Sequence, residues 1–464
     1  MASARRPNLL FILSDQHSPY VAGCYGDPLA QTPNLDGLAA SGVLLENVYC
    51  PSPLCVPSRM AMLTGRYPYQ NEVWTNDHIL DSGIPTFAHA LGAGGYRPVL
   101  IGRMHSVGPD QLRGYAERLV GDHGPNYVGG SEAPRGILAG TAGPERVSLV
   151  RSGPGQSGYQ IHDEYVTAAT VDAINRLGVA KRAGRQAEPF CLTVGFMLPH
   201  QPFVARREDY DLYRARMTLP SYPAAFSDDP HPYIRRWRQK AGIEQVGEDE
   251  VLRARTAYWA LVTRLDHMVG EILRALREND LASDTLVVYT SDHGEQVGEH
   301  GLWWKQTFYE QSVKVPAIVA WPGVIPAGTR CDRVVSSLDV MATMLDALGA
   351  PTLPRSNGRG LLRLLASPSE QAGWDDEAFS EYCTDEGWYC RMIRRGDWKL
   401  SYYHGHEPQL VNLRDDPGEQ VDRARDPGCE HILDDLTARV LDGWDPERIA
   451  AILAAKRADN RILA

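Results

Sequence analysis

The chain of 464 residues can bury one large hydrophobic core or a large and a small one, and its 43% hydrophobic content excludes a disordered protein. Its 47 basic and 58 acidic side chains give a formal net charge of −11. No run of Lys or Arg offers a continuous phosphate-binding surface, so nucleic acid is excluded as an expected partner.

The first apolar run, 8–13, is too short for a secretory signal, whose apolar core has roughly 7–15 residues and is followed by a cleavage site. No stretch approaches the roughly 20 apolar residues that span a membrane. We therefore expect no membrane partner and a cytoplasmic location. Eight cysteines in a chain of this length fit a reducing compartment better than a disulfide scaffold.

Short apolar, β-branched runs alternate with helical patterns over most of the chain. The predicted strands are 8–13, 97–101, 190–197, 285–290 and 315–320. The predicted helices are 33–41, 59–64, 85–93, 163–177, 249–278 and 338–348. This alternation predicts an α/β fold with a large, mostly parallel sheet that carries helices on both faces.

The character of the sequence changes after a segment rich in Pro, Gly and Ser at 351–376. Short strands are predicted at 378–383, 389–395, 398–403 and 409–413, followed by helices near 431–441 and 446–457. We therefore predict an α/β catalytic domain over 1–370 and a small C-terminal α+β subdomain with an antiparallel sheet over 371–464. Residues 103–160 and 201–247 read as long irregular segments, as active-site loops often are.

Chemically capable side chains follow four of the predicted strands, where ligands of open α/β sheets bind. They are Asp15 and Gln16, Arg103 and His105, His200, and Asp292 and His293. Two carboxylates, an amide oxygen and an imidazole could hold a divalent cation and leave room for a substrate oxygen. The sequence thus predicts a metal site at this edge of the sheet.

Cys55 begins the stretch Cys55-Val56-Pro57-Ser58-Arg59, which leads into Leu63-Thr64-Gly65-Arg66. A thiol just before a proline-initiated helix lies where backbone N–H groups and the helix dipole favour negative charge. That position suits either a thiolate or an anionic substrate.

These two motifs, at this spacing, resemble the hallmark of the type I sulfatases of the alkaline phosphatase superfamily. The resemblance extends over nearly the whole chain, and choline-sulfatase-like enzymes look most similar. Further landmarks are Thr32-Pro33-Asn34-Leu35-Asp36, Ser291-Asp292-His293-Gly294-Glu295, Gly298-Glu299-His300-Gly301, Gly396-Asp397-Trp398-Lys399 and Asp415-Asp416-Pro417.

The resemblance implies an alkaline-phosphatase-like fold and hydrolysis of a small-molecule sulfate monoester. It implies that a maturation enzyme converts Cys55 to formylglycine, the nucleophile. The implied metal ligands are Asp15, Gln16, residue 55, Asp292 and His293. Arg59 would orient the nucleophile; Arg103, Lys305 and Asn76 would bind sulfate; His105 would assist elimination; and His200 with Lys305 would serve the leaving group. Self-association is common in such enzymes, so a homo-oligomer is an open expectation.

Three positions depart from the common family pattern. Gln16 replaces a second Asp, as in the choline-sulfatase branch, and weakens neutralisation of the metal. His293 replaces an Asn, and its nitrogen suits manganese better than calcium, although calcium is the first expectation. Arg103 stands where Lys is usual. The planar guanidinium of Arg can bind two oxygens at once, whereas the ammonium of Lys acts as a point charge.

Two other functions are open at this point. One is a phosphonate or phosphate mono- or diester hydrolase with the same nucleophile; the other is a sulfate-ester-binding protein without catalysis. The leaving group is also open, because 121–133 lacks the tryptophan-containing stretch of choline sulfatases. An aryl or sugar ring could instead contact aromatic residues from the set Trp74, Tyr127, Trp303, Trp304 and Tyr309.

Overall fold

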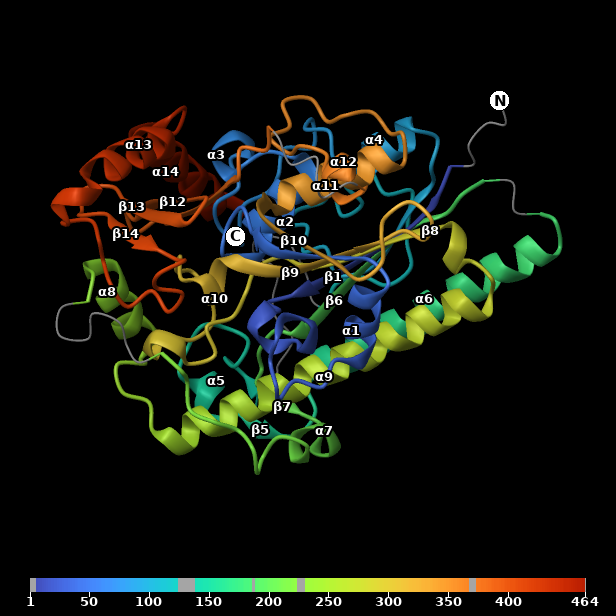
Figure 1. The fold of residues 1–464 in the computed structure, drawn as a ribbon, viewed down its shortest axis with the longest axis horizontal. Coiled ribbons are helices and arrows are strands. Elements are labelled where there is room, and N and C mark those ends of the chain that lie inside the picture. The colour runs from blue at the N-terminus through green and yellow to red at the C-terminus, as the bar shows by residue number, and fades with distance from the viewer. Residues whose placement is uncertain (1–5, 124–137, 186–187, 223–229, 367–372, 464) are drawn as a thin grey trace.

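A large mixed sheet organises the molecule (Figure 1), which a computed structural model describes for residues 6–123, 138–185, 188–222, 230–366 and 373–463. In these residues the strand order is β10-β2-β9-β8-β1-β6-β3-β4. The bounds are β1 Asn8–Asp15, β2 Val43–Tyr49, β3 Pro98–Gly102, β4 Glu117–Arg118, β6 Cys191–Pro199, β8 Thr285–Ser291, β9 Lys314–Ala320 and β10 Thr329–Ser336.

Parallel pairing dominates this sheet and confirms the predicted fold class. Strands β8, β1, β6 and β3 are parallel neighbours, so their carboxyl ends meet at one edge. Strand β9 runs antiparallel to both β8 and β2. The direction of β9 was not predicted, nor were β2 and β10. In the first half of β10 the exposed Arg330 and Asp332 flank the buried Cys331, as at a sheet edge. No long apolar run therefore marks this strand.

Helices cover both faces of the sheet (Figure 1). On one face lie the long helices α6 and α9; on the other lie α2, α4, α11 and α12. The helices of the main part are α1 Pro33–Ala40, α2 Cys55–Thr64, α3 Pro68–Asn71, α4 Phe87–Ala93, α5 Val147–Val150, α6 Gly158–Arg182, α7 Arg207–Asp211, α8 Pro232–Ala241, α9 Glu248–Glu278, α10 Glu310–Val313, α11 Ser337–Ala347 and α12 Leu362–Ala366.

Helix α9 shows why the helical predictions succeeded. It buries apolar residues on its sheet-facing side, including Leu261, Leu265 and Ile272. Its first turn carries Glu248, Asp249 and Glu250, whose charges complement the positive end of the helix dipole. In contrast, α8 lies inside the segment 201–247 that was read as irregular, because its charge-rich sequence buries only a few apolar side chains such as Ile234 and Trp237.

A second, antiparallel sheet forms the C-terminal part, as predicted. It comprises β11 Glu377–Cys383, β12 Tyr389–Arg395, β13 Trp398–Tyr403 and β14 Gln409–Asn412, with α13 Glu430–Leu441 and α14 Pro446–Leu463 packed beside it. Trp74 of the main part joins Cys383, Trp444 and Ile449 in one hydrophobic cluster. The predicted domain boundary at 370/371 lies outside the described residues, so the division into two domains stays a prediction.

Two observations bear on the expected environment. All eight cysteines are free thiols. In the described part of the chain, no helix combines the length and apolar character needed to cross a membrane.

Candidate active site

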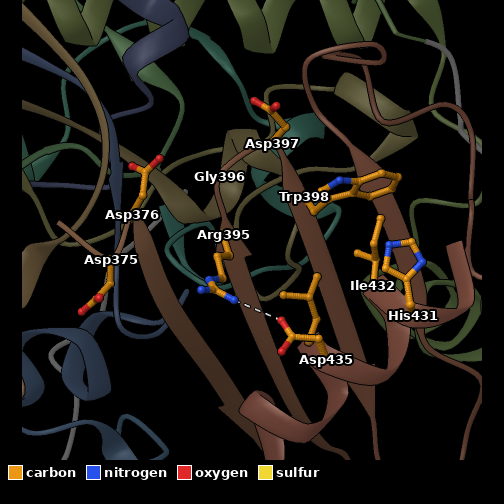
Figure 2. A pocket seen from close by; sticks show the side chains of 10 residues that line it. Asp375, Asp376, Arg395, Gly396, Asp397, Trp398, His431, Ile432 and Asp435 are labelled. Atoms are coloured by element: carbon orange, nitrogen blue, oxygen red, sulfur yellow. Dashed lines mark hydrogen bonds and ion pairs between the residues drawn. The ribbon is translucent and has the colours of Figure 1, made fainter. Parts of the chain in front are cut away.

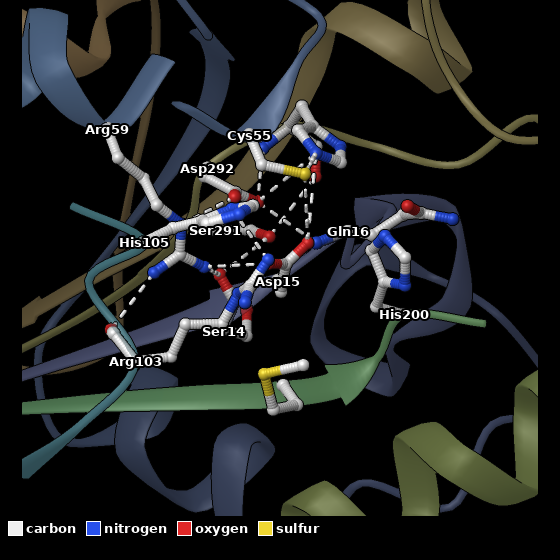
Figure 3. A network of polar contacts seen from close by, with 12 residues as sticks. Ser14, Asp15, Gln16, Cys55, Arg59, Arg103, His105, His200, Ser291 and Asp292 are labelled. Atoms are coloured by element: carbon white, nitrogen blue, oxygen red, sulfur yellow. Dashed lines mark hydrogen bonds and ion pairs between the residues drawn. The ribbon is translucent and has the colours of Figure 1, made fainter. Parts of the chain in front are cut away.

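Cys55 is the first residue of α2 and is 1% exposed, at the carboxyl edge of the main sheet (Figure 3). Its Sγ lies 3.2 Å from His293 Nε2, 3.3 Å from Lys305 Nζ and 3.7 Å from Asp15 Oδ1. Burial and the charge of Asp15 raise the pKa of the thiol to about 11, although Lys305 opposes them. The unmodified side chain in these surroundings is therefore a thiol and not a thiolate at neutral pH.

Two buried carboxylates lie beside Cys55, each braced by an arginine. Asp15 Oδ2 accepts from Arg103 Nε at 2.6 Å and from an Arg59 guanidinium N–H at 3.1 Å. Asp292 Oδ2 accepts from Arg59 Nε at 2.7 Å. Burial alone would raise the pKa of Asp15, but Arg103 and Arg59 hold it well below its usual range. The carboxylates thus turn their Oδ2 atoms to the arginines and their Oδ1 atoms toward His293.

This donor set fits a divalent cation. One ligand atom from each of Asp15, Cys55, Asp292 and His293 lies within 4.8 Å of all the others, and all four residues are buried. His293 Nδ1 lies 3.0 Å from the carbonyl oxygen of Gly294, which can only accept, so Nδ1 carries the hydrogen of the neutral ring. The lone pair of Nε2 consequently faces the cluster, as a metal-ligating imidazole requires.

Gln16 lies next to this cluster but is held in a different network. Its Oε1 accepts a hydrogen bond from Lys305 Nζ, and its Nε2 donates to Gln201 Oε1 at 2.6 Å and to Glu295. Gln16 also has a left-handed backbone conformation, with φ of 67°. Its predicted role as a fifth metal ligand therefore stays a prediction.

The two predicted histidines carry their hydrogens on different nitrogens. His105 Nδ1 accepts from an Arg103 guanidinium N–H at 2.6 Å, so Nε2 holds the hydrogen when the ring is neutral. His200 Nδ1 donates to Gln201 O at 2.6 Å, which leaves the Nε2 lone pair open. Burial lowers the pKa of both rings well below the usual value, with Arg103 adding to the shift at His105 and Lys305 at His200.

Asn76 closes the first turn of α2. Its Oδ1 accepts from the backbone N–H of Val56 at 3.0 Å, directly after Cys55. The structure thus gathers all the predicted site residues at one edge of the sheet, although Lys305 and Cys55 are 250 positions apart.

Sequence reasoning did not assign roles to three residues that support the cluster. Ser58 donates to the carbonyl oxygen of Asp292 at 2.5 Å. Glu295 anchors the segment that carries Lys305 by accepting from the backbone of Val297 and Trp304. Asp122 accepts from the backbone N–H of His105 at 3.2 Å. Ser58 and Glu295 stand inside the quoted motifs, which was an available signal; Asp122 has none.

The aromatic residues that could have contacted a substrate ring are buried at the described positions. Trp74, Trp303 and Trp304 are at most 1% exposed, and Tyr309, at 7%, stacks on His300. Trp74 Nε1 donates to Glu381 and Trp304 Nε1 to Ser148. These rings are buried inside the protein, and the indole N–H groups of Trp74 and Trp304 already have internal partners. Tyr127 and most of the segment 121–133 lie outside the described residues.

A cavity of about 450 Å³ lies elsewhere, in the C-terminal part (Figure 2). Its wall includes Trp398, Ile432, Arg395 and Asp435, and the last two form an ion pair at 3.1 Å. None of the predicted site residues lines it. We therefore place the chemistry at Cys55 and not at this cavity.

The fold and this donor cluster define a hydrolase of the alkaline phosphatase superfamily. The profile of the Sulfatase family matches residues 7–350, and that of "N-sulphoglucosamine sulphohydrolase, C-terminal" matches 298–444. A choline-sulfatase of Rhizobium meliloti is 32% identical over 438 residues, 91% of this chain and 83% of that protein. Arylsulfatase K of Canis lupus familiaris is 27% identical over 464 residues, 94% of this chain and 82% of that protein.

Structural similarity agrees with the sequence matches. The phosphonate monoester hydrolase of Agrobacterium radiobacter has the same fold, with a TM-score of 0.75 at 23% identity, covering 94% of this chain and 95% of that one. The chain belongs to the Sulfatase family, and as an enzyme it is a sulfuric ester hydrolase.

Proposed function

We propose that this enzyme hydrolyses a sulfate monoester to an alcohol and sulfate with a formylglycine made from Cys55 and one divalent cation. The observation that carries this proposal is the position of Cys55 Sγ, 3.2 Å from His293 Nε2 and 3.3 Å from Lys305 Nζ. Hydrated formylglycine supplies two hydroxyls on one carbon, one to attack sulfur and one to drive release of sulfate.

Asp15, Asp292, His293 and residue 55 would hold the cation, with Gln16 as the fifth proposed ligand. A bound cation would withdraw negative charge from a sulfate oxygen and from the attacking hydroxyl. Calcium is the first expectation because two carboxylates contribute, and the nitrogen of His293 makes manganese the alternative.

The cationic side chains of the site stabilise the charge that develops on sulfate. Arg59 joins Asp15 and Asp292 and so fixes the surroundings of residue 55. Arg103 and Lys305 bind the sulfate oxygens, and Asn76 adds a contact from the helix start. Such fixed donors in a site away from water stabilise a transition state more than they do in solvent.

His200 and His105 handle protons at opposite stages. Sulfate bound between Lys305 and His200 favours the protonated form of His200, which with Lys305 supplies the proton for the leaving oxygen. Contact between Arg103 and sulfate releases His105 Nδ1, the acceptor atom of that ring, to take a proton during elimination. The two different tautomers of the free site match these two roles.

Mass spectrometry of the Cys55 peptide tests the modification. The chain is expressed with and without a formylglycine-generating maturation enzyme, and turnover of an aryl sulfate is measured for both samples. We expect the aldehyde and the activity to appear together. Full activity with an unmodified thiol would refute the mechanism.

The alternative is a phosphonate or phosphate ester hydrolase, because the guanidinium of Arg103, which can bind two oxygens at once, could shift the balance between sulfate and phosphorus esters. Turnover of matched aryl sulfate, phosphate and phosphonate esters decides between the two. We expect kcat/KM to be highest for the sulfate; a preference for phosphorus by orders of magnitude would overturn the sulfatase assignment.

The same assay identifies the alcohol. We propose an aryl or sugar sulfate in preference to choline sulfate, since a quaternary ammonium calls for an aromatic cage and the sequence of 121–133 contains no tryptophan. A panel of aryl sulfates, sulfated sugars and choline sulfate tests this choice, and turnover of choline sulfate alone would contradict it.

A further inference from the structure

Helix α6 carries two adjacent titratable residues, His162 and Asp163, that are outside the Cys55 site. His162 is 8% exposed and Asp163 is fully buried. Neither belongs to a motif that the sequence marks for catalysis. Both nevertheless contact segments that deliver catalytic side chains.

Asp163 fixes the end of strand β6. Its carboxylate accepts from the backbone N–H of Met197, at 2.9 and 3.0 Å to its two oxygens, and from that of Leu198 at 2.8 Å. The backbone N–H of His200 in turn donates to Met197 O at 3.0 Å. Asp163 therefore holds the turn from which His200 enters the site.

His162 reaches the other side of the site. Its Nε2 lies 2.8 Å from the carbonyl oxygen of Gly121. The next residue, Asp122, accepts from the backbone of His105 at 3.2 Å, and its Oδ1 is 3.8 Å from an Arg103 guanidinium nitrogen. His162 thus contacts the segment that holds Arg103 and His105.

The hydrogen-bond partners of His162 indicate that both of its ring nitrogens carry hydrogens. Gly121 O can only accept, so Nε2 must donate. Burial raises the pKa of Asp163, against the hydrogen bonds from His162 and from the backbone of Met197 and Leu198. When Asp163 is ionised, Nδ1 of His162, 3.0 Å from its Oδ1, donates as well. Beside an ionised Asp163, a neutral imidazole with its one hydrogen would leave one of these acceptors without its donor.

The surrounding charges agree with this geometry. Burial alone would lower the pKa of His162, but the hydrogen bond and charge of Asp163, with Gly121 O and Asp122, raise it. The ring of His123 faces His162 at a centroid distance of 6.2 Å. Because the pKa of the folded state is raised, the doubly donating form is present at low pH and is lost as pH rises.

We propose that protonated His162 and Asp163 form a positioning pair that sets His200 relative to Arg103 and His105, and that the enzyme slows when this proton is lost. The kinetic part of this inference rests on the proposed function. The pair touches neither residue 55 nor a proposed metal ligand among the contacts described, so it acts through the backbone and not on the substrate.

Histidine NMR on the wild-type protein tests the protonation without any substrate. We expect the His162 ring to be the imidazolium at pH 7 and to lose this state in Asp163→Asn. A neutral ring at pH 7 would overturn the proposal, whether or not the enzyme proves to be a sulfatase.

Kinetics test the positioning role. We expect His162→Gln to lower kcat by about 10- to 100-fold, as small misplacements of catalytic groups do, and to change KM less. The fall of kcat at high pH that comes from loss of the His162 proton should be absent in this variant. His431→Gln, on the exposed face of α13, is the matched control and should match the wild type. Aldehyde content at residue 55 is measured in each sample, which separates failed maturation from lost positioning. An unchanged kcat and pH profile in His162→Gln would refute the pair's role.

Discussion

Two buried groups of charged side chains lie around Cys55 and around Lys399. They differ in how completely their hydrogen-bond donors are paired with acceptors inside the group. Lys399 Nζ donates to Phe308 O at 2.8 Å, to Glu310 Oε1 at 3.0 Å and to Glu419, so its three hydrogens meet three acceptors. Around Cys55, in contrast, Asp15 Oδ1, His293 Nε2 and Lys305 Nζ converge on one sulfur atom. In the first arrangement the cation is fully paired, whereas in the second the side chains converge on the residue that we propose reacts.

The largest expected effect is a loss of activity, which distinguishes the Cys55 group from the Lys399 group. Cys55→Ala removes the proposed nucleophile and should lower kcat by at least about a thousandfold. Its free energy of unfolding should change by much less than its activation free energy. Cys50→Ala, a buried thiol five positions earlier, is the matched control and should keep its kcat. Steady-state kinetics with urea unfolding measures both properties. Comparable loss of kcat in the two variants would contradict a special role for Cys55.

The reverse pattern is expected at Lys399. Lys399→Met leaves Glu310 and Glu419 buried without their cation, and should cost about 3–5 kcal/mol of unfolding free energy. Lys240→Met is the control, because Lys240 pairs with Glu386 at the surface and exposed pairs contribute about 0–1 kcal/mol. Urea unfolding measures the difference. A loss in Lys399→Met no larger than in Lys240→Met would show that the Lys399 group is not structural.

Removal of divalent cations should affect only the Cys55 group. A cation at 100 times its Kd stabilises the folded state by about 2.7 kcal/mol, so a chelator should lower Tm and abolish turnover. Adding calcium or manganese back should restore both and identify the ion. Asp292→Asn should lose the response of Tm, and Glu310→Gln should keep it. A chelator-insensitive wild type would contradict the metal site.

The smallest effect concerns Glu381 on β11, which accepts from Trp74 Nε1 at 3.0 Å. Burial raises its pKa from 4.5 to about 7, against the charge of Arg391. The folded state therefore binds this proton more tightly, and stability falls as pH rises from about 4.5 to 7. Between pH 5 and 8 the wild type should lose about 1–3 kcal/mol relative to Glu381→Gln, by urea unfolding. Parallel pH dependence of the two proteins would refute the shift.

Local patterns in the sequence predicted much of the fold. The apolar runs of β1, β6 and β8 and the periodic face of α9 are signals within a few residues, and the structure contains all four elements. Strand β10 was missed because charged residues alternate with its buried ones. The antiparallel direction of β9 depends on its pairing with β2 and β8, and no local pattern encodes pairing.

The structure brings the predicted site residues together, but the contacts among them were not predicted. The strand-end rule and the cysteine motif named most of these residues from local sequence, and the resemblance to sulfatases added Arg59, Asn76 and Lys305. The attachment of Gln16 to Lys305 and Glu295 joins segments almost 300 positions apart and could be seen only in the fold. The His162–Asp163 pair shows the same limit, because its partners are backbone atoms, which carry no sequence signature.

The place of Arg103 is decided by a residue that has no side chain. Its backbone N–H donates to Gly195 O at 2.8 Å, and a Cβ at position 195 would lie 1.7 Å from the Arg103 carbonyl oxygen. Main-chain packing thus fixes the backbone of position 103, which we propose binds sulfate, independently of its side chain. Arg103→Lys would therefore keep this backbone contact, while the hydrogen bonds of the guanidinium to Asp15 and His105 would be lost or changed.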